Sequence, residues 1–159
     1  MKKVPFSKFQ YGLEAASLFL LLYQGWYLLT GWDSIPDQIP AHYNAAGIPD
    51  RWDGKGSLLM LFGICFLIYL LITVISYFPA TWNAPVKITA ANEQFVYGNL
   101  SRMLSIIKLS IIGCFTYINI RSAQGGSLGA WFMIIFLLAM FGSMVYYILK
   151  IVRGAKKFQ

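Results

Sequence analysis

The only histidine of the chain, His42, lies in a polar segment at residues 31–57 that is rich in aspartate and proline. Imidazole and carboxylate groups together could bind a divalent cation such as zinc. The candidate ligands are His42, Asp50 and Asp53, although their spacing matches no established metal motif. The alternative is a segment held by its own hydrogen bonds, in which Asn44 and Asp50 cap turns.

The same segment is a candidate for ligand binding. It contains three of the six prolines and four of the six acidic residues of the chain. Because proline fixes its own φ and restricts the residue before it, we expect an ordered loop rather than a flexible linker. The side chains that could bind a secreted peptide or a small ligand are Asp37, His42, Asn44, Asp50, Trp52 and Lys55.

Two ionisable residues lie within otherwise apolar stretches. Glu14 and Lys108 are expected at the same depth in a membrane, where ionisable groups are costly and usually have a partner or a function. Either Lys108 extends to the membrane interface and Glu14 is solvated there, or the two side chains form an ion pair that holds their helices together. A transport pathway would need further polar groups, and toward the other side the sequence offers Gln24, Thr116 and Asn119.

The residues of the chain do not form a pattern typical of nucleophilic catalysis. A catalytic serine or cysteine needs a nearby base, most often histidine. However, His42 lies in the polar segment, whereas Cys65 and Cys114 lie in apolar stretches. The sequence therefore favours a protein that is not an enzyme. A metal-dependent membrane enzyme that uses His42 and Asp50 is the alternative.

The composition indicates which elements must position these residues. Of 159 residues, 58% are hydrophobic and 12% are charged, and the charged share is about half that of a soluble domain. Four stretches are long and apolar enough to cross a bilayer as helices. The sequence therefore predicts an all-α integral membrane protein that forms a single four-helix bundle over residues 1–159, with helices at about 13–30, 58–78, 103–120 and 128–152.

The distribution of lysine and arginine predicts how this bundle is oriented. With four helices, one side of the membrane holds both termini and a loop at 79–102, and the other side holds the segment 31–57. The first side carries nine basic residues, which are Lys2, Lys3, Lys8, Lys87, Arg102, Lys150, Arg153, Lys156 and Lys157. The second carries three, which are Arg51, Lys55 and Arg121. By the positive-inside rule, both termini are cytoplasmic and segment 31–57 is external.

This orientation also explains the formal net charge of +7. Basic residues on the cytoplasmic side attract the anionic lipids of the inner leaflet. The lipid bilayer is therefore the expected partner of these charges, and direct binding of nucleic acid is not expected. The predicted location is a cytoplasmic membrane, which the chain crosses several times.

The string from Ile35 to Lys55 resembles a bacterial membrane-domain family of unknown function. Its matching residues are Ile35-Pro36-Asp37-Gln38-Ile39-Pro40-x-His42-x-Asn44-Ala45-Ala46-Gly47-x-Pro49-Asp50-x-Trp52-x-x-Lys55. A second stretch resembles the same family, with Pro85-Val86-Lys87-Ile88-Thr89-x-x-Asn92 followed by Tyr97, Arg102 and Lys108. That domain also forms the N-terminal part of SdpI-like immunity and signalling proteins.

The resemblance implies toxin immunity or signalling. It also implies a peptide ligand on the external face and a protein partner on the cytoplasmic face, near Asn92 and Arg102. We therefore expect a membrane protein that senses or binds a ligand through segment 31–57. One alternative is a subunit of a small transporter or channel, which would need to oligomerise to form a pathway. The other alternative is the metal-binding membrane enzyme.

Overall fold

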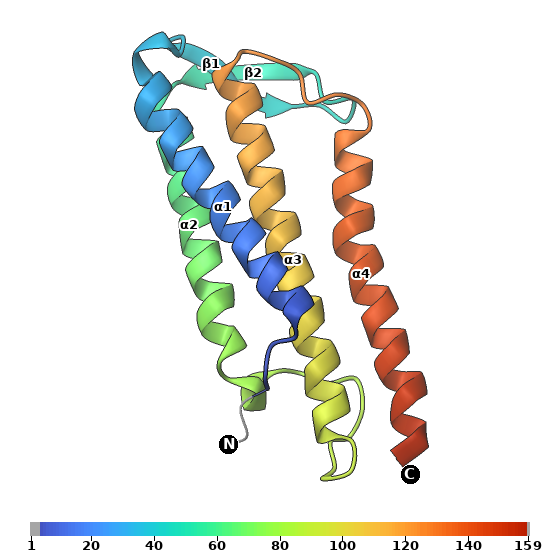
Figure 1. Cartoon of the computed structure of the whole chain (residues 1–159). Coiled ribbons are helices and arrows are strands. Elements are labelled where there is room, and N and C mark those ends of the chain that lie inside the picture. The colour runs from blue at the N-terminus through green and yellow to red at the C-terminus, as the bar shows by residue number, and fades with distance from the viewer. Residues whose placement is uncertain (1–3, 159) are drawn as a thin grey trace.

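The computed structural model describes residues 4–158, which are mostly helical (Figure 1). The long helices are α1 (Lys8–Gly31), α2 (Gly56–Ser76), α3 (Glu93–Ala123) and α4 (Phe132–Ala155). A two-stranded antiparallel sheet, β1 (Gln38–Tyr43) and β2 (Pro49–Gly54), lies between α1 and α2 in the sequence. Three short 3₁₀ turns complete the described chain, at η1 (Trp32–Ser34), η2 (Pro79–Thr81) and η3 (Lys156–Phe158).

Three helices in this part of the chain are long and apolar enough to cross a membrane. They cover Gly56–Ser76, Glu93–Ala123 and Phe132–Phe158, and they indicate a membrane protein. The helix predicted at 103–120 is the upper part of the longer α3, and the one predicted at 128–152 begins only at Phe132. The stretch predicted at 13–30 lies in α1, which is not among these three apolar helices.

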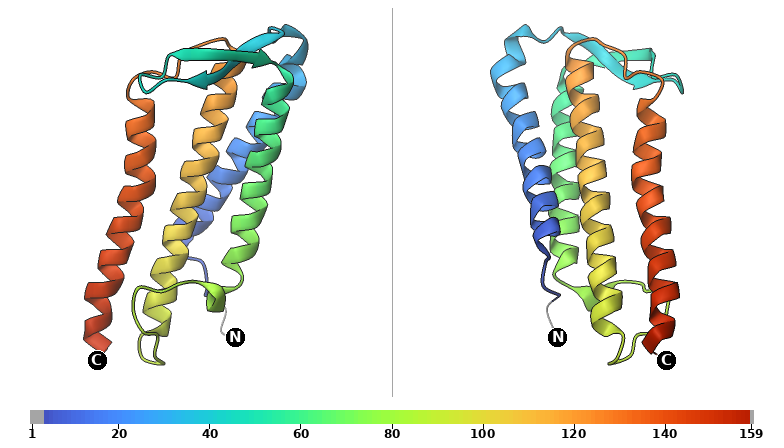
Figure 2. Two further views of the ribbon diagram at one scale, coloured as in Figure 1. Left: turned by 180° about the vertical axis from the view of Figure 1, so that it is seen from behind. Right: turned by 45° about the vertical axis from the view of Figure 1, so that its right-hand side comes forward.

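Helix α3 is the centre of the arrangement. It packs extensively against α1, α2 and α4, whereas α1 and α2 contact each other sparsely (Figure 2). The helices run alternately up and down. Helix α1 begins and α4 ends at one end of the molecule, which we call the terminal end, and the sheet lies at the other, which we call the hairpin end (Figure 1).

A capping box determines where α1 begins. The Gln10 backbone N–H donates to Ser7 Oγ over 3.4 Å, and the Ser7 backbone N–H donates to Gln10 Oε1 over 3.0 Å. The amide group of Gln10 then donates to Ser101 Oγ of α3 over 2.7 Å. The first turn of α1 is therefore attached to α3, and this attachment places Glu14 one turn further along the same face.

The segment predicted as an ordered loop is a β-hairpin, so the expectation of an all-α chain was wrong at this place. In the register, Ile39 lies opposite Asp53 and Pro40 opposite Trp52, and the pairing shifts between Pro40 and His42. Two hydrogen bonds stabilise the turn, because Asn44 Oδ1 accepts from the N–H groups of Ala46 (2.9 Å) and Ile48 (3.1 Å). The hairpin lies across the ends of the helices (Figures 1 and 2).

One face of the hairpin end is packed as a hydrophobic core. Buried residues from the hairpin, from the turn before it and from three helices form this cluster, which comprises Leu28, Ile35, Ile39, Leu58 and Ala123. Burial of a single aliphatic side chain of this size contributes roughly 1.5–3 kcal/mol. The hairpin is therefore part of the folded body and has a defined orientation relative to the helices.

Candidate functional site

The sequence-predicted pair of Glu14 and Lys108 is present in the structure. The Lys108 ammonium on α3 contacts the Glu14 carboxylate on α1. The Lys108 side chain is only 1% exposed, whereas that of Glu14 is 19% exposed. The side chain of Lys108 is thus directed at Glu14 and is shielded from the surface of the described structure.

Helix α2 completes the surroundings of the ammonium group. Lys108 Nζ donates to Thr73 Oγ1 over 2.9 Å and lies 4.8 Å from the centroid of the Tyr69 ring. The Thr73 hydroxyl in turn donates to the backbone carbonyl of Tyr69 over 2.6 Å. One buried cation therefore connects three helices through a carboxylate, a hydroxyl and an aromatic face.

A cavity of about 610 Å³ adjoins this pair at the terminal end of the bundle. Polar groups of Glu14, Thr73 and Lys108 line it from one side. Its other walls are aromatic, aliphatic or small side chains, namely Val4, Pro5, Phe6, Tyr11, Tyr69, Ser76, Tyr77 and Pro79. The cavity is thus an apolar space with one compact ionic group in its wall.

Polar contacts of α3 with α1 and with α2 continue toward the hairpin end. Thr116 Oγ1 donates to Gln24 Oε1 over 3.3 Å, and Asn119 Nδ2 donates to the Leu58 carbonyl over 3.1 Å. Gln24, Thr116 and Asn119 are all buried, as expected for a polar stripe that faces the bundle interior. Among residues 4–158, Gln24 Nε2 and Asn119 Oδ1 are buried without a protein partner. The two hydrogen bonds orient α3 against α1 and α2 but leave some hydrogen-bonding capacity unused.

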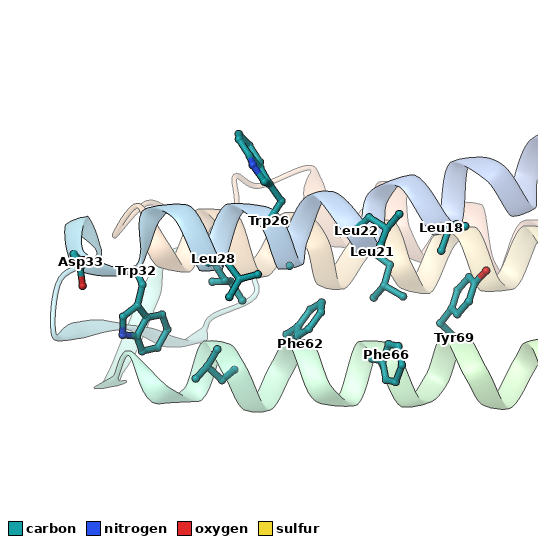
Figure 3. Close-up of a pocket in the computed structure, with 13 residues that line it drawn as sticks. Leu18, Leu21, Leu22, Trp26, Leu28, Trp32, Asp33, Phe62, Phe66 and Tyr69 are labelled. Atoms are coloured by element: carbon teal, nitrogen blue, oxygen red, sulfur yellow. The ribbon is translucent and has the colours of Figure 1, made fainter.

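A second hollow lies between α1 and α2, where the two helices contact each other sparsely. It is a groove of about 840 Å³. The side chains of Leu21, Phe62 and Tyr69 point into the space between the helices, and the Trp26 indole points away from α2 (Figure 3). Apart from Gly25 and Asp33, the lining residues are large and mostly apolar, namely Leu18, Leu21, Leu22, Trp26, Leu28, Leu29, Trp32, Leu59, Phe62, Phe66 and Tyr69.

The hairpin brings together some of the predicted ligand-binding residues. His42 Nδ1 lies 2.5 Å from Asp50 Oδ1, and both side chains are about half exposed. Lys55 Nζ lies 3.1 Å from Asp37 Oδ1 and 5.4 Å from the centroid of the Trp32 ring. Asn44 is a structural residue, because it forms the turn. Trp52 is exposed on β2 and is not part of these pairs.

The structure does not assemble the predicted metal site of His42, Asp50 and Asp53. Across residues 4–158 there is no cluster of three His, Cys, Asp or Glu side chains that could hold a metal ion. Asp50 pairs with His42, but Asp53 Oδ1 accepts from the Gly54 backbone N–H over 2.8 Å. Asp53 lies opposite Ile39, three residues before His42, which lies opposite Arg51, so the strand pairing keeps Asp53 away from the His42–Asp50 pair.

Two hairpin residues to which the sequence analysis gave no such role, Tyr43 and Gly47, attach the hairpin to α3 and to the connection between α3 and α4. Tyr43 OH shares a hydrogen bond of 2.9 Å with Ser122 Oγ of α3, and it also donates to the Gly126 carbonyl over 3.3 Å. The Leu128 backbone N–H donates to the Gly47 carbonyl over 2.8 Å. Burial raises the pKa of Tyr43 above its ordinary value of 10.0, and the hydrogen bond with Ser122 opposes part of this shift.

Gly47 is the closest point between the hairpin and the connection that precedes α4. Its φ is +72°, and a Cβ atom placed there would lie 2.6 Å from the Gly129 carbonyl oxygen. The glycine at this position predicts a turn. Nothing in the sequence, however, indicates that the backbone of Gly129 comes this close to it. The attachment depends on residues about 80 positions apart, as for Tyr43 and Gly126.

The residues predicted to contact a cytoplasmic partner lie at the terminal end. Asn92 is buried, where its Oδ1 accepts from the Thr89 N–H over 2.8 Å and its Nδ2 donates to the Lys87 carbonyl over 3.0 Å. Its contacts are therefore structural ones at the start of α3. Arg102 is partly exposed. Lys2 and Lys3 of the predicted basic side lie outside the described residues.

Together, the fold and these contacts define a helical membrane protein whose sheet covers one end of the helices. Within it, residues 19–66 match the family model of a domain of unknown function, DUF1648. The matched region runs from the middle of α1 through the hairpin into the first half of α2. No curated protein and no solved structure shows significant similarity to the chain.

Proposed function

We propose that this protein crosses the inner membrane of a bacterium four times and binds a peptide on its external face through the hairpin. Helix α1 supports the four-span arrangement, because its 24 residues extend about 36 Å, compared with about 30 Å for the hydrocarbon core. Its polar side chains Gln10, Ser17 and Gln24 are buried against the other helices rather than exposed to lipid.

The charge distribution supports an orientation with the terminal end in the cytoplasm. The basic residues at Lys8, Lys87, Lys150, Arg153 and Lys156 belong to the terminal end of the bundle. The hairpin end carries Asp33, Asp37, Asp50 and Asp53, and its basic residues are Arg51, Lys55 and Arg121. This asymmetry favours an external hairpin by the positive-inside rule.

The main support for peptide binding is that β2 is exposed, while β1 of the same hairpin is packed against the helix ends. Residues 50–53 of β2 are exposed, whereas Ile39 and Pro40 of β1 are buried. A strand at the edge of a sheet presents backbone N–H and C=O groups to which an extended peptide can add as a further strand. Next to that edge, the exposed side chains of Arg51, Trp52 and the His42–Asp50 pair would provide selectivity.

The hairpin is attached to three helices, so that binding of a peptide to the hairpin could change how these helices are arranged. Strand β2 leads directly into α2 through Lys55, Tyr43 binds α3, and Gly47 binds the connection that leads to α4. Suppose that the hairpin has two orientations relative to the helices. A peptide that binds one orientation more tightly would then shift the helices toward the arrangement that accompanies that orientation. A role in signalling or in immunity to a secreted peptide is consistent with this coupling.

The orientation is tested by cysteine labelling in intact bacteria. In variants that lack Cys65 and Cys114, a membrane-impermeant maleimide should label Asp53→Cys from outside. Lys87→Cys should react only after the cells are permeabilised. Labelling of Lys87→Cys in intact cells, with protection of Asp53→Cys, would contradict the proposed orientation.

Peptide binding is tested with the full chain in lipid nanodiscs. Short unconstrained peptides displayed on phage are selected against it, and the enriched peptides are synthesised and titrated. We expect Trp52→Ala to weaken their binding at least about tenfold, which corresponds to about 1.4 kcal/mol. Trp131→Ala is the matched control, because Trp131 is also strongly exposed at the hairpin end but lies outside the hairpin. Failure to enrich any peptide, or equal losses in the two variants, would contradict the proposal.

A further inference from the structure

The two hollows of the molecule adjoin each other along α1 and α2. The groove extends over the hairpin-side part of both helices, and the cavity lies at the terminal end, where α1 begins and α2 ends. Tyr69 lines both of them. We call the two together the α1–α2 crevice. It is apolar along most of its length and ionic at the Glu14–Lys108 pair.

The apolar part of the crevice has the dimensions of a lipid chain. On α2 it extends from Leu59 to Tyr69, a distance of about 15 Å along the helix. This is about half of the hydrocarbon thickness of a bilayer, which is the length that the chains of one leaflet cover. Leu22 lines the groove and is 63% exposed. A chain could therefore enter sideways from the membrane.

The ionic part of the crevice selects for a particular type of headgroup. Glu14 and Lys108 together carry no net charge, and Lys108 is almost completely buried. A headgroup with a net charge would leave one charge without compensation in a poorly hydrated space, which is costly. A headgroup with one phosphate and one ammonium keeps the space neutral. The phosphate would face Lys108 and the ammonium would face Glu14.

Further groups in the cavity wall suit an ammonium. The Ser76 hydroxyl donates to the Ile72 carbonyl of its own helix, so its oxygen can accept from a ligand, whereas Thr73 Oγ1 already accepts from Lys108 Nζ. The rings of Tyr11 and Tyr77, which also line the cavity, are exposed and offer aromatic faces to a cation.

We propose that the α1–α2 crevice binds a zwitterionic phospholipid, with one acyl chain in the groove and the phosphate–ammonium headgroup against the Glu14–Lys108 pair. This site is separate from the hairpin. The proposal therefore does not depend on peptide binding at the external face.

Native mass spectrometry of the delipidated protein in detergent tests the headgroup. The protein is titrated with phosphatidylethanolamine or with phosphatidylglycerol that carries the same acyl chains. We expect retention of one phosphatidylethanolamine molecule at roughly tenfold lower lipid concentration than is needed for phosphatidylglycerol. Free phosphoethanolamine, which has no chains, should not displace the lipid. Equal retention of both lipids, or displacement by the free headgroup, would overturn the proposal.

A pair of matched variants tests the groove. Leu22 on α1 and Leu67 on α2 are both 63% exposed, but only Leu22 is among the residues that line the groove. Leu22→Trp should fill the groove and lower retention of phosphatidylethanolamine at least about fivefold, whereas Leu67→Trp should leave it unchanged. If the two variants behave alike, the lipid binds to the general apolar surface and the proposed site is wrong.

An exposed tyrosine tests the headgroup end without disturbing the ion pair. Tyr77→Ala removes an aromatic wall of the cavity and should reduce the preference for phosphatidylethanolamine over phosphatidylglycerol. Tyr146→Ala on α4 is the control, since Tyr146 is also exposed but does not line the cavity. An unchanged preference in Tyr77→Ala would contradict the headgroup position. Thermal unfolding of every variant in the same detergent verifies that it is folded.

Discussion

The ammonium of Lys108 on α3 contacts the carboxylate of Glu14 on α1, 94 positions earlier in the sequence. The two partners are not equivalent, because Lys108 is almost fully buried whereas Glu14 faces the cavity at the terminal end. The buried ammonium therefore needs the opposite charge of its partner more than the partly exposed carboxylate does. This asymmetry determines how single substitutions at the two positions should differ.

We expect Glu14→Gln to destabilise the protein more than Lys108→Met does. Glu14→Gln leaves a buried ammonium without a counter-charge, which costs about 3–5 kcal/mol, whereas Lys108→Met removes that charge and leaves a partly exposed carboxylate. The double variant should lose less stability than the sum of the single losses. Thermal unfolding in one detergent measures all three. Lys150→Met on α4 is the control for loss of a lysine, and strict additivity of the pair would argue against the contact.

Gly47→Ala should be far more destabilising than Gly54→Ala, although both glycines lie in the hairpin region. Gly47 has a φ of +72°, and its new Cβ would meet the backbone of Gly129, while the space around Gly54 is open. We expect a loss of roughly 2 kcal/mol or more for Gly47→Ala and a loss within about 1 kcal/mol for Gly54→Ala. Limited proteolysis of the hairpin, together with thermal unfolding, measures the difference. Similar behaviour of the two variants would mean that the hairpin is not packed on the connection before α4.

Ionisation of Tyr43 should loosen the hairpin at alkaline pH. Burial raises the pKa of Tyr43 in the folded protein above 10.0, so the neutral phenol is favoured by folding. The corresponding stability is complete below pH 10 and is lost as the pH rises through the folded-state pKa. Absorbance of tyrosinate during a pH titration measures this. In Tyr43→Phe, the absorbance change of one tyrosine that ionises above pH 10 should disappear. In Tyr23→Phe on α1, that absorbance change should remain.

His42→Ala should change stability by no more than about 1 kcal/mol, because the pair with Asp50 is exposed and such pairs contribute little. The same substitution should also leave the metal content of the purified protein unchanged, since Asp53 is not beside the pair. Elemental analysis of wild type and variant measures the zinc content. Stoichiometric zinc in wild type that is lost in His42→Ala would show that the metal hypothesis was correct after all.

The helices and the ion pair could be predicted from local properties of the sequence. Long apolar stretches predict helices wherever they occur, since the backbone must satisfy its hydrogen bonds internally in a membrane. The match in depth between Glu14 and Lys108 follows from counting residues along two such helices. Gln24 on α1 and Asn119 on α3 are also buried, each on the polar face of its own helix.

The hairpin was harder to predict. Prolines and aspartates in segment 31–57 correctly indicated order, but they gave no strand signal, because proline and aspartate are depleted in strands. Here Ile35 and Ile39 are packed against Leu28, Leu58 and Ala123, and this burial outweighs the local preference. From its composition, the segment between the two helices was expected to be a loop. It forms a two-stranded sheet because its apolar residues pack against the ends of the helices.

The order of apolar and basic residues along the chain was enough to predict a membrane protein with long helices and a basic terminal end, because hydrophobicity and charge act locally and add along the chain. Contacts between distant residues had to be seen in three dimensions. The meeting of Tyr43 with Ser122, the approach of Gly47 to Gly129 and the separation of Asp53 from the His42–Asp50 pair depend on strand register and on how the hairpin packs on the helices. A shift of one residue in a strand changes every such contact without changing the composition at all.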